Sequence, residues 1–166
     1  MNVFEFAMQM EKDGEAYYRK MAGQAGNAVL KKVLDQLADD EVKHYNIFKK
    51  FRDGDFSGVP QLAATGTTIL NDAKNVFQEL SAGSRNFSFG TDITDTWKEA
   101  QAVEKKSEDF YREKAAKETN EDIKKTLNII ADEEHKHWTL IEHILQFVQR
   151  PRQWLEDAEW NHLEDY

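Results

Sequence analysis

The sequence predicts an all-α protein, a four-helix bundle, and three observations lead to this prediction. Only two of the 166 residues are proline, and the long stretches around Pro60 and Pro151 are rich in Ala, Glu, Lys and Leu, which helices prefer. No stretch alternates apolar and polar residues as a half-buried strand would. One predicted helical hairpin also repeats later in the chain. The length and the 40% apolar share suit one domain with a single core.

The predicted elements follow from where the apolar periodicity begins and ends. We expect four long helices at residues 2–24, 27–52, 92–117 and 121–149, a short C-terminal helix at 152–164, and a helical segment at 69–80. The joints after the first and third long helices are short, which favours tight hairpins.

The domain organisation follows from these helices. Residues 53–91 join the hairpins 2–52 and 92–149, and so long a connection suggests a crossover that makes the second and third long helices parallel. We assign the bundle domain to residues 1–149. The tail 150–166 either caps the bundle or joins a dimer interface, and we expect a homodimer. An exchange of hairpins between subunits stays open.

The two hairpins resemble each other without a gap. The segment AMQMEKDGEAYYRKMA in the first helix matches AQAVEKKSEDFYREKA in the third, which aligns Glu11 with Glu104 and Tyr18 with Tyr111. The same offset places LADDEVKHY of the second helix on IADEEHKHW of the fourth. Two such hairpins packed with pseudo-two-fold symmetry would form one bundle.

Charged groups interrupt the apolar seam of every long helix near its middle. One Glu lies there in the first and third helices, and a Glu-x-x-His pair in the second and fourth: Glu11, Glu104, Glu41 with His44, and Glu134 with His137. Burying one ionised carboxylate costs several kcal/mol, so four together need protons or cations. Two divalent ions would balance the four charges and leave both imidazoles neutral.

The spacing of these residues agrees with the charge balance. Residues three apart share a helix face, so each Glu and its His can bind one metal. This arrangement is the ligand pattern of di-iron and di-manganese bundles. Oxygen and nitrogen ligands without sulfur suit iron or manganese, and zinc could also occupy the site. The sequence therefore predicts two metal ions, with iron as the first choice.

These motifs resemble a known family, the rubrerythrin-like branch of the ferritin-like di-iron carboxylate superfamily. The resemblance rests on MEKDGEAYY, DDEVKH, VEKKSEDFY and DEEHKH, and it covers all four long helices. It implies a ferritin-like bundle whose di-iron centre reacts with peroxide or dioxygen. It also implies that the hydroxyls of Tyr18 and Tyr111 hydrogen-bond ligand carboxylates across the bundle, while their alternative role is core packing.

The chain departs from the family pattern in two respects. Typical members carry a further metal-binding glutamate three residues after the third-helix ligand, where this sequence has Ser107, with Gly14 at the matching place in the first helix. The redox-linked iron movement that depends on that ligand is therefore not implied, and the two small residues would leave room for an oxidant. Many members also carry a rubredoxin-like iron-thiolate module, which requires cysteine.

Several residues near the predicted ligands have alternative roles. Glu15 and Glu108 could approach the site, although solvated ion pairs are favoured. Four acidic residues could orient a ligand histidine: Asp39, Asp40, Asp132 and Glu133. The remaining histidines are expected at the surface: His135, His143 and His162.

Composition narrows the partners and the location. A net charge of -9 argues against sustained contact with nucleic acid or an anionic membrane. The absence of cysteine removes disulfides, thiolate catalysis and iron–sulfur ligation, so electrons must come from an external donor. The N-terminal segment is no secretory signal, and no apolar stretch approaches the ~20 residues that span a bilayer. We therefore expect a cytoplasmic protein.

Three functions remain open from the sequence. The first is an oxidoreductase of the peroxidase or ferroxidase type, which reduces hydrogen peroxide or dioxygen while ferrous iron is oxidised. The second is a bundle that holds or delivers metal, or senses oxidation by changing shape, without turnover. The third is a metal-free structural bundle with protonated or hydrated acids.

Overall fold

The computed structural model describes residues 2–57, 66–70, 78 and 91–149 of the chain. Four long helices account for most of them: α1 Val3–Gln24, α2 Ala28–Arg52, α5 Thr91–Lys117 and α6 Glu121–Gln149. The described residues contain no strand. The predicted all-α class is confirmed, and each long helix begins and ends within a residue or so of its predicted bounds.

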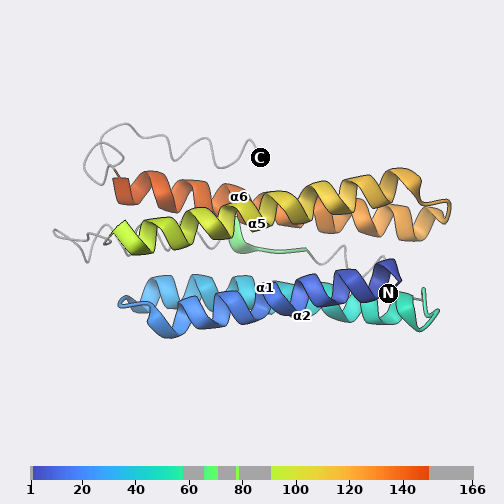
Figure 1. Ribbon diagram of the computed structural model, residues 1–166, viewed down its shortest axis with the longest axis horizontal. Helices are drawn as coiled ribbons and strands as arrows, with labels where there is room; N and C mark the ends of the chain where they lie inside the picture. Colours follow the sequence, from blue (N-terminus) through green and yellow to red (C-terminus); the bar gives the residue numbers. More distant parts are fainter. Residues whose placement is uncertain (1, 58–65, 71–77, 79–90, 150–166) are drawn as a thin grey trace.

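The helices form two antiparallel hairpins that lie along each other (Figure 1). α1 packs against α2, and α5 packs against α6. α2 and α5 run in the same direction, as the long connection between them requires (Figure 1). The two hairpins of the chain thus lie together as one bundle (Figure 1), and an exchange of hairpins between subunits stays open.

Asparagine side chains begin three of the four helices. Asn2 accepts hydrogen bonds from two backbone N–H groups and forms a capping box with Glu5. Asn27 accepts from the first turn of α2, and Asn120 does the same for α6. Asn27 and Asn120 occupy matching places in the repeat, so both tight turns end on the same cap.

The apolar core consists of two clusters, one toward each end of the bundle. One cluster is centred on Leu34, Trp97 and Leu140, and the other on Phe48 and Tyr111. In every helix the residues of one cluster precede the predicted metal ligands and those of the other follow them. The polar centre is therefore closed off from water along the bundle axis by packed side chains on both sides.

Two predicted elements fall outside the described residues. These are the C-terminal helix at 152–164 and most of the segment at 69–80, of which residues 69, 70 and 78 are described and helical. Residues 66–70 of the connection lie against the middle of the bundle, where the Ile69 side chain is buried in the first cluster.

Candidate metal centre

The six predicted ligands come together in the middle of the bundle. All are buried, and none is more than 5% exposed. Their ligand atoms fall into two groups within 4.8 Å, one of Glu11, Glu41, His44 and Glu134, the other of Glu41, Glu104, Glu134 and His137. Glu41 and Glu134 belong to both groups, so their carboxylates lie where they can bridge two ions.

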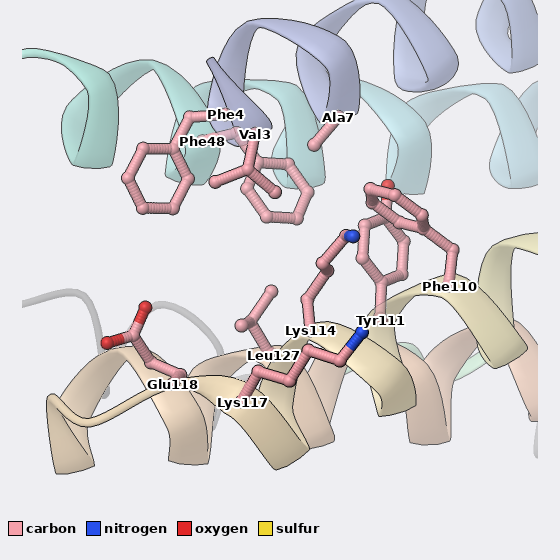
Figure 2. A pocket seen from close by; sticks show the side chains of 10 residues that line it. All are labelled: Val3, Phe4, Ala7, Phe48, Phe110, Tyr111, Lys114, Lys117, Glu118 and Leu127. Atoms are coloured by element: carbon pink, nitrogen blue, oxygen red, sulfur yellow. The ribbon is translucent and has the colours of Figure 1, made fainter.

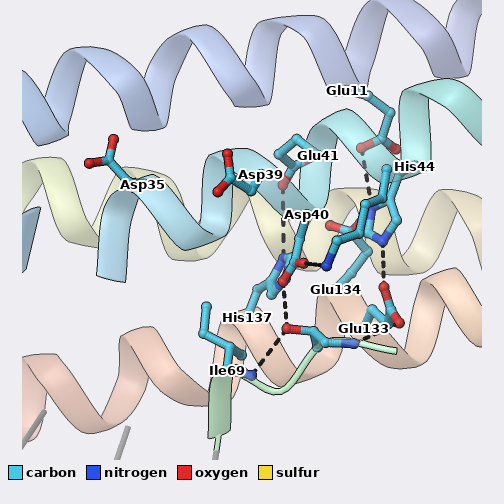
Figure 3. A network of polar contacts seen from close by, with 12 residues as sticks. Glu11, Asp35, Asp39, Asp40, Glu41, His44, Ile69, Glu133, Glu134 and His137 are labelled. Atoms are coloured by element: carbon cyan, nitrogen blue, oxygen red, sulfur yellow. Dashed lines mark hydrogen bonds and ion pairs between the residues drawn. The ribbon is translucent and has the colours of Figure 1, made fainter. Parts of the chain in front are cut away.

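Each imidazole lies near carboxylates of both hairpins. Figure 3 shows His44 beside Glu11 and His137 beside Glu41. The Nδ1 atom of His44 lies 2.9 Å from Glu134 and 3.4 Å from Glu11. The Nδ1 atom of His137 lies 3.5 Å from Glu104 and 3.8 Å from Glu41. The two rings are 6.1 Å apart. A cation placed between these atoms would have one nitrogen and several oxygen neighbours.

The atoms that face the centre lack hydrogen bonds, which is the best test of fit for a cation. Among the described residues, five inward atoms of the predicted ligands are buried without a hydrogen-bond partner: Oε2 of Glu11, Oε2 of Glu104, Oε1 of Glu134, and Nδ1 of His44 and His137. Buried polar atoms are rarely left so, because each costs about 1–3 kcal/mol. Metal ions would satisfy all five.

The outer nitrogens of the two imidazoles contact carboxylates of the opposite hairpin. The Nε2 atom of His44 lies 2.7 Å from Glu133, and that of His137 lies 3.2 Å from Asp40. An ionised carboxylate can only accept, so Nε2 carries a proton, and Nδ1 is the nitrogen that would bind a cation once its own proton has left. Such partners fix the ring and increase its basicity.

The other two candidate acids of this kind have a different role. Asp39 pairs with Arg19 of α1, and Asp132 pairs with Arg112 of α5. These ion pairs tie the two helices of each hairpin together at the surface.

Two tyrosine hydroxyls connect the hairpins at the centre. Tyr18 donates a hydrogen bond to Glu104, and Tyr111 donates one to Glu11. Both rings are buried. Each tyrosine therefore holds the carboxylate of the opposite hairpin while it packs in the core, so the two alternatives drawn from the sequence coexist.

Burial and repulsion raise the pKa of the two shared carboxyls. Burial is the main cause for both, followed for Glu41 by the charge of Glu134 and for Glu134 by the charge of Glu104. Without cations, burial and repulsion therefore favour the protonated form of both carboxyls.

The two imidazoles also hold protons in the metal-free centre. Burial lowers their pKa values, but the surrounding carboxylates more than offset it. The nearby carboxylates of Glu11 and Glu133 raise the pKa of His44 well above 6.5, and the charge of Glu104 raises that of His137 to about 10. Protons thus take the place of the positive charge that metal ions would supply.

Gly14 and Ser107 occupy matching positions of the two hairpins, but their surroundings differ. A Cβ atom on Gly14 would lie 3.1 Å from the carboxylate of Glu41, so that carboxylate fills the space beside the glycine. The expectation that Gly14 leaves room for an oxidant is therefore not met. Ser107 is buried on α5.

The acids one turn beyond Glu11 and Glu104 form ion pairs, but the solvated position favoured from the sequence holds for Glu15 and not for Glu108, which is buried. Glu15 lies 4.0 Å from Arg19. Glu108 is more enclosed, and it lies 3.2 Å from both Lys105 and His135. The His135 side chain is 44% exposed.

A cavity of about 190 Å³ lies between the first turns of α1 and the last turns of α5 (Figure 2). Its walls are mostly apolar, and Ala7, Phe48 and Tyr111 form the part toward the centre, with Lys114 and Lys117 also lining it. Since Tyr111 also contacts Glu11, one side chain separates this space from a predicted ligand.

One contact of the centre could not be seen in the sequence. Thr67 donates to Glu133 through its backbone N–H and to Asp40 through its hydroxyl. It lies in the connection between the hairpins, where no helical spacing relates it to the ligands.

Two antiparallel hairpins around a buried cluster of four glutamates and two histidines define a ferritin-like four-helix bundle with a site suited to two metal ions. The chain belongs to the rubrerythrin family, since the model of that family, Rubrerythrin, matches residues 2–145. Comparisons with curated proteins and with solved structures gave no significant match. None of the described helices has the uninterrupted apolar length that a bilayer crossing requires.

Proposed function

We propose that the protein is a di-iron oxidoreductase that reduces hydrogen peroxide or dioxygen. One observation carries the proposal: two four-residue ligand groups share Glu41 and Glu134 and have inward atoms without hydrogen bonds. Membership of the rubrerythrin family supports iron as the metal. Two ferrous ions bound there would supply the two electrons that, with two protons, convert one hydrogen peroxide to two waters.

The residues of the chain divide the work of holding the ions. Glu41 and Glu134 would bridge them, because they alone belong to both groups. Glu11 with His44 would complete one site, and Glu104 with His137 the other. Four carboxylates balance two divalent ions, which keeps the buried centre neutral.

The surroundings of the centre support a reaction with a small oxidant. The apolar clusters on both sides limit access by water. Tyr111 lines the cavity and also contacts the predicted ligand Glu11. The cavity therefore offers a path by which a small molecule could approach the centre. The electrons would come from an external donor, because the chain has no cysteine for an iron–sulfur group. A homodimer and a cytoplasmic location remain predictions.

The decisive experiment is anaerobic loading with ferrous iron, followed by stopped-flow mixing with peroxide or with dioxygen. We expect about two ions per chain and an oxidation at least tenfold faster than that of free ferrous iron in the same buffer. The Glu134→Ala variant is the control, because it removes a shared carboxylate. Oxidation no faster than that of free iron would exclude the proposed activity.

The second candidate function is a protein that holds or delivers metal or senses oxidation, and the buried centre suits this function equally. Turnover separates the two: with a steady supply of reductant an oxidoreductase continues to consume peroxide, whereas a binder reacts once and stops. Wild-type protein without bound metal would instead leave the structural bundle as the remaining function.

A further inference from the structure

The connection between the hairpins contributes one residue to the surroundings of the centre. Residues 66–70 lie beside α2 and α6, and the buried side chain of Ile69 anchors them (Figure 3). Gly66 has a φ of 34°, and a Cβ there would lie 3.4 Å from Glu133. The backbone therefore passes close to a carboxylate that contacts a ligand histidine.

Thr67 contacts both acids that hold the histidines. Its backbone N–H donates to Oε1 of Glu133 at 2.9 Å, and the other oxygen of this carboxylate contacts His44. Its hydroxyl donates to Oδ2 of Asp40, the same oxygen that contacts His137. One residue thus hydrogen-bonds the acidic partners of both imidazoles, although the two histidines belong to different hairpins.

The hydrogen-bond pattern fixes the direction of the hydroxyl. The backbone N–H of Ile69 donates to Oγ1 of Thr67 at 3.2 Å, which leaves the hydroxyl proton for Asp40. Asp40 is buried, and its other oxygen accepts from Lys43 at 2.6 Å. Since both oxygens of Asp40 are held by donors, its orientation toward His137 is determined.

We propose that Thr67 is a positioning residue for the two metal ions, and that its hydroxyl acts specifically on the ion bound by His137. The inference rests on the metal centre proposed above. The contact to Glu133 uses the backbone and survives a side-chain substitution, whereas the contact to Asp40 uses the hydroxyl and does not. Removing the hydroxyl should therefore affect one of the two ions and leave the other.

The test is the Thr67→Val variant, which keeps the shape of the side chain and removes the hydroxyl. Affinities for both ions are measured by anaerobic chelator competition with ferrous iron, and with cobalt, whose visible spectrum reports on ligand geometry. We expect binding of one ion to weaken severalfold, up to about tenfold, below most of the roughly 10- to 100-fold range of groups that contact a ligand directly, because Thr67 acts through Asp40. Thr67→Ser should restore it.

Two controls make the result specific. Thr126→Val makes the same change at a buried threonine whose hydroxyl donates to Asp122 within its own helix, and it should leave both affinities unchanged. In an Asp40→Ala background, Thr67→Val should add less than it does alone, because the Thr67 hydroxyl then has no Asp40 oxygen through which to act.

The outcomes separate this inference from the proposed function. Wild-type affinities in Thr67→Val, or an equal loss of both ions with a lower melting temperature of the metal-free protein, would overturn the role of Thr67 and leave the centre intact. Wild-type protein that binds no pair of ions would overturn the metal centre and this inference together.

Discussion

The two hairpins present the same groups to the centre and different groups behind them. Each supplies one glutamate, one Glu-x-x-His pair and one tyrosine, and the inward atoms match between the halves. Behind them, Asp40 on α2 has Glu133 as its counterpart on α6, and Gly14 on α1 has Ser107 on α5. The two hairpins carry the same residue types at the positions that would bind a cation. They carry different residue types at the positions that fill space or orient a ligand.

The same contrast appears one turn further out. Glu15 and Glu108 occupy matching places, yet their side chains are 36% and 11% exposed. Thr67 also has no counterpart, because there is only one connection between the hairpins. The comparison teaches that ligand chemistry constrains the centre more tightly than packing constrains its surroundings. The two ions would therefore have ligands of the same residue types, but different residues would position those ligands.

The largest effect should come from the shared carboxylates. Glu41→Ala and Glu134→Ala should each abolish binding of both ions, because either residue belongs to both ligand groups. Glu11→Ala and Glu104→Ala should each remove only one ion. Metal analysis of protein loaded and desalted under identical conditions measures the difference.

The helical circular dichroism of the metal-free variants is the control for folding. It should be retained, since each change also removes one of four mutually repelling buried carboxyls from the metal-free centre. If Glu41→Ala kept one ion while Glu134→Ala kept none, the equivalence of the two hairpins at the centre would be refuted.

The ligand positions could be predicted because helical intervals translate directly into directions. Glu41 and His44 share a face through a spacing of three, and the repeat extends this pattern to Glu134 and His137. The choice of Asp40 over Asp39 could not be predicted in this way. Adjacent residues point about 100° apart, and the packing angle of the hairpins decides which one meets a histidine.

Two other features depended on tertiary structure alone. Thr67 contacts residues far away in the sequence, and nothing in its local pattern indicates a role. The missing side chain of Gly14 indicates a space beside the helix, but the sequence does not indicate that the Glu41 carboxylate fills it. The carboxylate of Glu41 reaches it only because α1 and α2 pack closely there.

The next largest effect should be that of pH on metal binding. The raised pKa values of Glu41, Glu134, His44 and His137 mean that the metal-free centre holds protons which the ions must displace. The affinity should therefore fall as the pH falls. If two ions displace four protons, it changes about a hundredfold per ion for each pH unit.

Chelator competition at several pH values measures this slope, and proton release into weakly buffered solution counts the protons. His44→Gln and His137→Gln should each reduce the proton count by the same amount if the halves are equivalent. An affinity that does not change with pH would contradict the description of the centre as a protonated cluster.

A smaller effect is expected from the tyrosine hydroxyls. Tyr18→Phe removes the hydrogen bond to Glu104, and Tyr111→Phe removes the one to Glu11. Each should weaken binding of one ion about tenfold, the low end for such contacts, because the carboxylate itself stays. Since the two variants act on different ions, the double variant should show the sum of their free-energy changes. A clearly larger effect of Tyr111→Phe would instead point to the cavity beside that ring.

The smallest effect should distinguish Gly14 from Ser107. Gly14→Ala places a Cβ 3.1 Å from the carboxylate of Glu41, which must move by a few tenths of an ångström. Such crowding costs about 1–3 kcal/mol, but alanine favours a helix by about 1 kcal/mol over glycine, so the free energy of unfolding should fall by about 0–2 kcal/mol. Metal affinity should fall more visibly, because Glu41 would bridge both ions.

Ser107→Ala adds no atom near a carboxylate and serves as the matched control. Urea unfolding of the metal-free proteins, compared with chelator competition of the loaded ones, separates these terms. If Gly14→Ala stabilised the protein and left both affinities unchanged, the close approach of Glu41 to α1 would matter neither for stability nor for metal binding.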